Sequence, residues 1–145
     1  SKFTWSRARS SPLATSMMRA EADEKVFPMA QVIHRAGGLA LEKKAADVVA
    51  LDLRTLSGAT DCFLLATGQS DAQVKSIAEH IIDELKKEDV RPEHIEGMKG
   101  GRWVLVDYID FVVHVFHPGA REFYQLDVLW GDAPRWDFDD SGDEP

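Results

Sequence analysis

The sequence predicts a single α/β domain in which helices flank a mixed, largely antiparallel sheet of five strands. A long amphipathic helix is expected from Ser70 to about Glu88, with short apolar runs of strand length before and after it. The last two runs, Trp103 to Val106 and Phe111 to Phe116, are separated by only four residues. They can therefore pair only as a tight antiparallel hairpin. A chain of 145 residues suits one such domain with tails.

The elements before the long helix follow from the spacing of apolar residues. Between Gln31 and about Ala46 these residues recur at helical intervals, with Gly37-Gly38 as a weak point. Asp47 to Leu53 is a Val-rich run that is too short for a stable helix, so it predicts a strand. Ser57 to Asp61 has the composition of a turn, and Cys62 to Ala66 predicts the second strand.

The long helix has a defined start and one apolar side. Ser70 and Gln73 fit a capping box, in which each side chain satisfies a free backbone N–H at the helix start. Asp71 adds a negative charge near the positive end of the helix dipole. The apolar stripe consists of Val74, Ile77, Ala78, Ile81, Ile82 and Leu85. Such a stripe predicts that the helix packs on the sheet.

The elements after the long helix complete the domain. Pro92 ends the helical unit, and His94-Ile95-Glu96 predicts a short strand that leads into the glycine-rich loop Gly97 to Gly101. The two hairpin strands follow this loop. A further helix is then expected from near Gly119 to Trp130.

Two tails are expected outside the domain, which we place at residues 29–131. Residues 1–28 are predicted to be a leader-like or disordered extension. Its first twenty residues are Ser-rich, with four Lys or Arg and no acid, which is also the composition of an organellar transit peptide. We therefore expect a cytoplasmic protein, or an organellar one if this segment is a transit peptide. Residues 132–145 are acidic, and we expect them to be disordered.

The composition argues against several classes of protein. No apolar run approaches the roughly 20 residues that are needed to span a bilayer. The single cysteine, Cys62, excludes an intramolecular disulfide and a multi-cysteine zinc site. Residues 31–130 carry eleven Lys or Arg against sixteen Asp or Glu, a net charge of −5. This charge is poorly suited to DNA or bare RNA and is better suited to a basic protein surface, although net charge does not exclude a local basic patch.

Motifs for metals, cofactors or catalysis are weak. His114 and His117 are three residues apart, so on a strand their side chains face opposite sides and share a metal only if the strand bends. The loop Gly97 to Gly101 is rich in glycine, but no Gly-Lys-Ser/Thr follows it and no helix is expected there. We therefore expect no metal, no cofactor and no catalytic residue.

The C-terminal part of the domain carries residues that packing alone does not require. They are Trp103, Asp107 to Asp110, Val113-His114-Val115, Arg121, Tyr124, Leu126 and Leu129-Trp130, and upstream Lys43 to Asp47, Asp52, Asp61 and Gly68-Gln69-Ser70. This pattern, over roughly Val32 to Trp130, resembles the ribosomal silencing factor family (RsfS, also called Iojap). One position departs from it, because the family often has Gly where this chain has Ile109. Since a β-branched residue does not readily adopt a positive φ, we expect a different backbone form of this turn.

The resemblance implies a fold remotely like that of nucleotidyltransferases and a function without catalysis. It implies binding to the large ribosomal subunit through its protein L-fourteen, steric exclusion of the small subunit and repression of translation. It also implies a homodimer of the free protein. One alternative is an assembly factor for the large subunit. Another is a nucleotidyltransferase-like enzyme, which would use Ser70, Asp107 and Asp110 to bind a nucleotide and metal ions.

The resemblance also implies which residues bind the partner. The expected contact residues are Trp103, Asp107, Tyr108 and Asp110, with Met98 and Lys99 of the adjoining loop as further candidates. An aromatic anchor with carboxylates around it complements a basic protein surface. The alternative for Trp103 is a place in the core. Arg121 and Tyr124 also match the family, with fastening of the last helix to the sheet as their alternative role.

Overall fold

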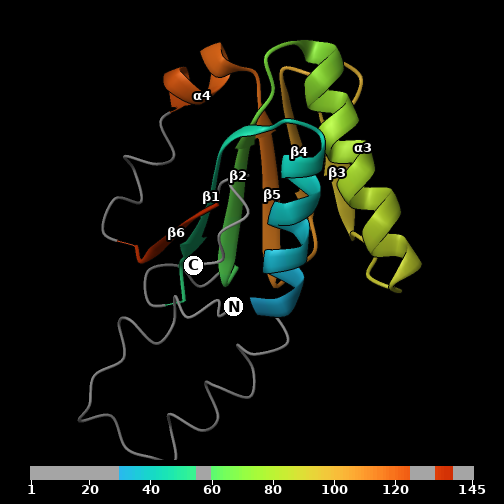
Figure 1. Ribbon diagram of the computed structural model, residues 1–145, viewed down its shortest axis with the longest axis vertical. Helices are drawn as coiled ribbons and strands as arrows, with labels where there is room; N and C mark the ends of the chain where they lie inside the picture. Colours follow the sequence, from blue (N-terminus) through green and yellow to red (C-terminus); the bar gives the residue numbers. More distant parts are fainter. Residues whose placement is uncertain (1–29, 55–59, 125–132, 139–145) are drawn as a thin grey trace, which may run out of the picture.

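The chain folds into one mixed sheet with helices packed against it, as seen in a computed structural model that describes residues 30–54, 60–124 and 133–138 (Figure 1). The first described helix spans residues 30–42. The other elements are β1 (Ala46–Asp52), β2 (Cys62–Thr67), α3 (Asp71–Lys87), β3 (His94–Glu96), β4 (Trp103–Asp107), β5 (Phe111–Phe116), α4 (Pro118–Tyr124) and β6 (Arg135–Phe138). None of the described helices is both long enough and apolar enough to cross a membrane.

The sheet has six strands in the order β3-β4-β5-β2-β1-β6. β4 and β5 form the predicted antiparallel hairpin, in which Trp103 lies opposite Phe116 and Asp107 lies opposite Val112. β2 and β5 pair in parallel, and every other pair is antiparallel. All five predicted strands are present, so the predicted α/β class and mixed sheet are confirmed.

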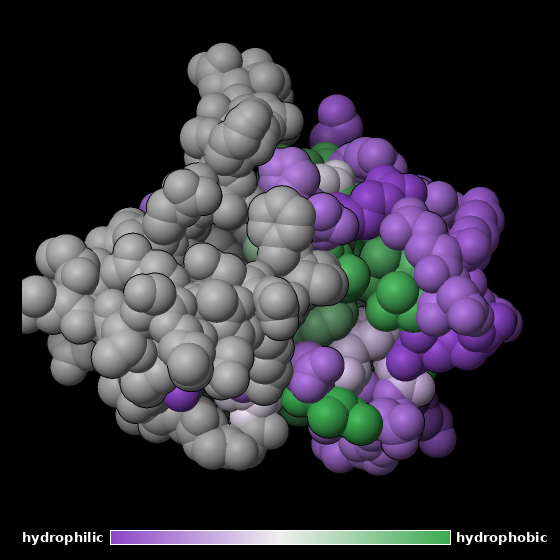
Figure 2. Space-filling view, turned by 90° about the horizontal axis from the view of Figure 1, so that it is seen from below, coloured by the Kyte–Doolittle hydropathy of each residue, from purple (hydrophilic) through white to green (hydrophobic). Residues whose placement is uncertain are grey.

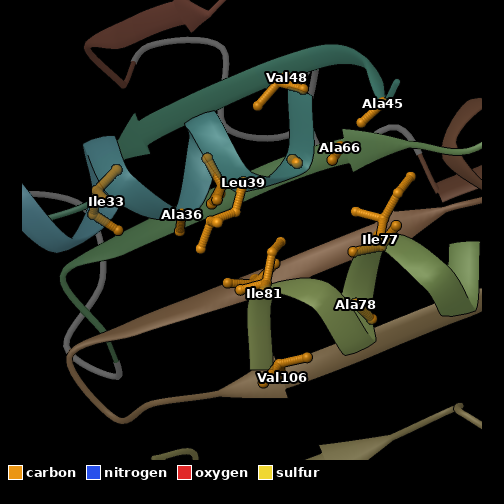
Figure 3. Close-up of a cluster of buried hydrophobic side chains, with 14 of the residues drawn as sticks. Ile33, Ala36, Leu39, Ala45, Val48, Ala66, Ile77, Ala78, Ile81 and Val106 are labelled. Carbon is orange, nitrogen blue, oxygen red and sulfur yellow. The ribbon is translucent and has the colours of Figure 1, made fainter. Parts of the chain in front are cut away.

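One face of the sheet carries the main core. Both the first described helix and α3 pack on this face (Figure 1). Their apolar side chains point toward one another and toward the strands (Figure 3). The members of this core that Figure 3 labels, from both the helices and the sheet, are Ile33, Ala36, Leu39, Ala45, Val48, Ala66, Ile77, Ala78, Ile81 and Val106. Each large aliphatic side chain buried here contributes roughly 1.5–3 kcal/mol to the free energy of unfolding, so this layer holds the fold together.

The start of α3 is tied to the turn that follows the first described helix. Ser70 Oγ accepts a hydrogen bond from Gln73 N at 3.1 Å, as the predicted capping box requires. The Gln73 side chain reaches back one residue further than expected, since its Oε1 accepts from Gln69 N at 2.6 Å. Its Nε2 also donates to the backbone oxygens of Lys43 and Lys44, each at 3.1 Å. One side chain therefore caps α3 and fixes it to the segment before β1.

β6 corrects the prediction for the C-terminal tail. The acidic composition of residues 132–145 predicted disorder, yet Arg135–Phe138 pairs antiparallel with β1. Trp136 and Phe138 alternate with charged residues and pack against the main core. The Phe138 ring fits because Gly37 has no side chain: a Cβ there would lie 2.5 Å from Phe138 Cε2. The predicted disorder is thus wrong for these four residues, while residues 139–145 lie outside the described part of the chain.

Arg121 fastens α4 to the sheet, which was one of its two expected roles. Its Nη1 donates to Asp47 O at 2.7 Å and to Thr67 Oγ1 at 2.8 Å, so it joins α4 to β1 and β2. The predicted continuation of α4 to Trp130 lies outside the described residues.

Arg121→Met should lower the free energy of unfolding by about 1–3 kcal/mol, because it removes both hydrogen bonds and keeps much of the apolar stem. Urea unfolding followed by circular dichroism would measure the change. Arg91→Met is the matched control, since Arg91 pairs with the exposed Asp89, and exposed ion pairs contribute little. Equal losses in the two variants would contradict the fastening role of Arg121.

Candidate partner-binding surface

The face of the sheet opposite the main core, here called the outer face, carries the predicted tryptophan. Strand alternation places Trp103, Leu105 and Asp107 on this face together with His114. Trp103 and Phe63 are half-buried and pack against a second apolar cluster. This cluster consists of Val49, Leu51, Leu53, Leu65, Phe116, Ala120 and Ala133. The outer face therefore offers part-exposed apolar side chains rather than a fully polar surface.

Trp103 is held in one orientation by two neighbours. Its Nε1 donates a hydrogen bond to His114 Nδ1 at 3.0 Å. Its ring stacks on Phe116, with centroids 5.2 Å apart and planes at 29°. The Trp103 ring therefore packs on the second cluster and still reaches the surface.

His114 is a buried and neutral histidine. Its Nδ1 accepts from Trp103, so the proton of the neutral ring is on Nε2. Nε2 is buried and has no hydrogen-bond partner among the described residues. Burial lowers the pKa of His114 to about 4, and the nearby Asp107 carboxylate acts in the opposite direction. The ring therefore remains an acceptor for Trp103 at neutral pH.

The turn between β4 and β5 brings the predicted acidic residues together. Tyr108 N donates to Phe111 O at 2.9 Å, and Asp110 N donates to Tyr108 O at 2.9 Å. Asp107 Oδ1 accepts from Ile109 N at 2.7 Å. Ile109 has a φ of +74°, so the expectation that its β-branched side chain excludes this backbone form is wrong. The local hydrogen bonds hold the backbone there against its steric preference.

Tyr108 lies apart from the surface. Its side chain is 8% exposed and belongs to the main core. The ring stacks on Phe111 with centroids 4.6 Å apart, and burial raises the pKa of its hydroxyl to about 12. Although Tyr108 was predicted to contact a partner, it therefore presents almost no surface. Its position in the core allows it to support the turn.

Met98 and Lys99 lie at the other end of the hairpin from the acidic turn. They precede β4, whereas Asp107 ends it. At roughly 3.3 Å per residue, Trp103 and Asp107 are about 13 Å apart along β4. Met98 is half-buried against the main core, and Lys99 is exposed. The predicted residues therefore form two groups, one at each end of β4.

The residues considered for a nucleotidyltransferase-like enzyme are not brought together. Ser70 follows the C-terminal end of β2, whereas Asp61 N, just before β2, donates to Asp110 O at 3.0 Å. The length of β2, roughly 16 Å, thus separates Ser70 from Asp107 and Asp110. Among the described residues, no group of three or more His, Cys, Asp or Glu side chains could hold a metal ion.

A pocket that the sequence did not predict lies between β1, β6 and the end of the first described helix. Its volume is about 600 Å³. Arg121 and Asp47 contribute to its lining, as does the ion pair of Arg135 and Asp137, whose atoms are 2.9 Å apart. Sequence reasoning missed this pocket because one of its walls is β6, where disorder was expected.

Comparison with known proteins identifies the family. Residues 27–145 match the family model described as "Ribosomal silencing factor during starvation", RsfS. "Ribosomal silencing factor RsfS" of Bacillus subtilis is 46% identical over 98 residues, which cover 68% of this chain and 83% of that protein. "Protein Iojap-related, mitochondrial" of Arabidopsis thaliana is 26% identical over 147 residues, which cover 88% of this chain and 80% of that protein.

Solved structures agree with this assignment. A crystal structure of a Chromobacterium violaceum protein has a TM-score of 0.66 and 36% identity, covering 70% of this chain and 85% of that chain. A crystal structure from Bacillus halodurans has a TM-score of 0.64 and 35% identity, covering 77% of this chain and 98% of that chain. The chain therefore belongs to the ribosomal silencing factor family, RsfS.

Proposed function

We propose that this chain binds the large ribosomal subunit through ribosomal protein L-fourteen, blocks joining of the small subunit and so represses translation without catalysis. Membership of the silencing factor family supports a role at the ribosome. The observation that carries the binding surface is Trp103, which is part-exposed and fixed by its hydrogen bond to His114. A ring that is already oriented loses little conformational freedom on binding, which favours its use as an anchor.

The proposed contacts extend from Trp103 along β4. They are Trp103, Asp107, Asp110, Met98 and Lys99, with Tyr108 supporting the turn from the core. The half-buried Asp107 and the exposed Asp110 place carboxylates at one end of β4. These charges complement a basic protein surface and favour encounter and alignment with it.

Sedimentation with separated ribosomal subunits tests the proposal. The wild-type protein should travel with the large subunit and reduce its association with the small one. Trp103→Glu should weaken large-subunit binding by about 30-fold or more, as expected for loss of an aromatic anchor. Because this change also removes packing on Phe116, Asp110→Lys serves as a second variant on an exposed side chain. It should weaken binding several-fold, and more strongly at low salt.

Glu79→Lys is the matched control, since Glu79 is exposed on α3 and α3 packs on the opposite face of the sheet. It should bind like the wild type. A wild-type protein that stays behind when the large subunit sediments would refute the proposed function. Equal binding by Asp110→Lys and Glu79→Lys would instead refute the role of the acidic turn.

We also propose that the free protein is a homodimer whose contact patch partly overlaps the ribosome-binding surface, so that dimer and ribosome compete. A variant that abolishes the dimer and leaves large-subunit binding unchanged or weaker would count against this overlap.

We propose that the protein is located where its ribosome is: in the cytoplasm, or in an organelle if residues 1–28 act as a transit peptide. Relatives named "Protein Iojap-related, mitochondrial" and "Protein Iojap, chloroplastic" support the organellar alternative.

A further inference from the structure

Ile109 combines exposure with an unfavourable backbone conformation. Its side chain is 57% exposed, and the only other large apolar side chain found exposed among the described residues, Ile95, is 39% exposed. Its φ of +74° lies in a region that β-branched residues rarely adopt. Glycine would relieve the strain, and asparagine tolerates this region better than isoleucine does. An exposed isoleucine here therefore costs stability without contributing to the core.

Contacts from a second loop hold Ile109 in place. Besides the bond from Ile109 N to Asp107 Oδ1, Thr60 Oγ1 donates to Ile109 O at 3.1 Å. Asp61 N donates to Asp110 O at 3.0 Å. Both Thr60 and Asp61 immediately precede β2, so the tip of the hairpin is bound to its neighbour in the sheet. The Ile109 side chain is thus presented outward from a fixed backbone and not from a free loop.

Carboxylates lie on both sides of Ile109 along the chain. Asp107 and Asp110 flank it, and the segment from Trp103 to Phe116 contains no Lys or Arg. Glu93 N donates to Asp107 O at 2.7 Å, so the exposed residue Glu93 also lies at this end of the sheet. Figure 2 views the molecule from this end and shows exposed apolar groups in green among hydrophilic groups in purple. An apolar tip among carboxylates matches a basic surface with an apolar depression.

We infer that Ile109 is an apolar anchor that inserts into the basic protein surface of the large ribosomal subunit, and that the strained turn exists to present it. This inference rests on the proposed function and adds a specific contact to it. Binding desolvates the Ile109 side chain. The flanking carboxylates then meet cationic groups of the partner. The strain is present before binding, so the side chain needs no rearrangement to reach its bound position.

Two variants at this position separate stability from binding. Ile109→Gly removes both the strain and the side chain. Ile109→Asn replaces the apolar side chain by a polar one that tolerates a positive φ. Ile109→Gly should raise the Tm by roughly 5 °C and weaken binding to purified large subunits by about tenfold. Ile109→Asn should weaken binding to the same extent without lowering the Tm. Ile95→Thr is the control: it removes the other exposed isoleucine, on β3, and should bind like the wild type.

The outcomes distinguish this inference from the proposed function. If the wild type fails to bind the large subunit, both are overturned. If the wild type binds and Ile109→Gly binds equally well, the anchor is overturned and the proposed function stands. A lower Tm for Ile109→Gly than for the wild type would overturn the claim that the native turn is strained. Equal weakening by Ile95→Thr would show a general apolar effect and overturn the specific role of Ile109.

Discussion

Replacing Gly97 by alanine should lower the free energy of unfolding by about 3 kcal/mol or more, the largest loss expected from a Gly→Ala change among the described residues. Gly97 has a φ of +86°, and a Cβ there would lie 2.0 Å from Trp103 O and 3.2 Å from Val104 Cα. These contacts are with backbone atoms, which have no alternative rotamer. The connection between β3 and β4 would have to shift, and with it the start of the strand that carries Trp103.

Gly100→Ala is the matched control in the same loop. A Cβ at Gly100 would meet nothing within 4 Å, and its φ lies outside the positive region. We expect a change within about 0.5 kcal/mol. Urea unfolding of both variants measures the difference, and the indole N–H signal of Trp103 in an NMR spectrum reports whether its environment has moved. Similar stabilities for the two variants would show that Gly97 does not pack against β4 as described.

Acidification should destabilise the protein through His114 by about 3 kcal/mol between pH 7 and a pH below 4. The pKa of His114 is about 4 in the folded protein, compared with 6.5 for a histidine that is not buried. Between these values the unfolded chain binds a proton that the folded chain does not, so stability falls as the pH falls. Each pH unit of this window contributes about 1.36 kcal/mol. Protonation of Nδ1 also removes the acceptor that orients Trp103.

His114→Gln isolates this effect from the titration of carboxyl groups. Glutamine offers Trp103 an amide oxygen as acceptor and does not titrate. Chemical unfolding measured from pH 3 to pH 7 should show a steeper loss of stability in the wild type than in the variant, with the difference confined to pH 4–6.5. Parallel curves across that range would mean that His114 is not buried in its neutral form.

Local patterns were sufficient to predict most of the fold. The stripe on α3 is confirmed by the complete burial of Val74, Ile77 and Leu85. It could be predicted because helical periodicity involves residues that are close in the sequence. The short link between β4 and β5 permits only one pairing, so the hairpin is confirmed as well. β6 was missed because it depends on a distant contact. The Phe138 ring packs where Gly37 leaves room, and no local signal in an acidic segment indicates that contact.

The candidate surface was harder to predict because exposure depends on the tertiary structure. The sequence identified Trp103 and the two aspartates, but it did not reveal that Tyr108 points into the core. The rule that β-branched residues avoid a positive φ failed at Ile109, because hydrogen bonds from Thr60 and to Asp107 outweigh it. Alternation along β4 was the one available signal that Leu105 shares the outer face with Trp103.

The two outermost strands limit how another copy of the chain can attach. An edge strand offers unpaired backbone groups, which invite β-augmentation by a second chain. Here the edges, β3 and β6, are only three and four residues long. Each carries an acid–base pair along its length, with His94 Nε2 2.6 Å from Glu96 Oε2 and Arg135 Nη2 2.9 Å from Asp137 Oδ1. Such short, charged edges disfavour a continuous intermolecular sheet, so association must use side chains on the faces and ends of the sheet.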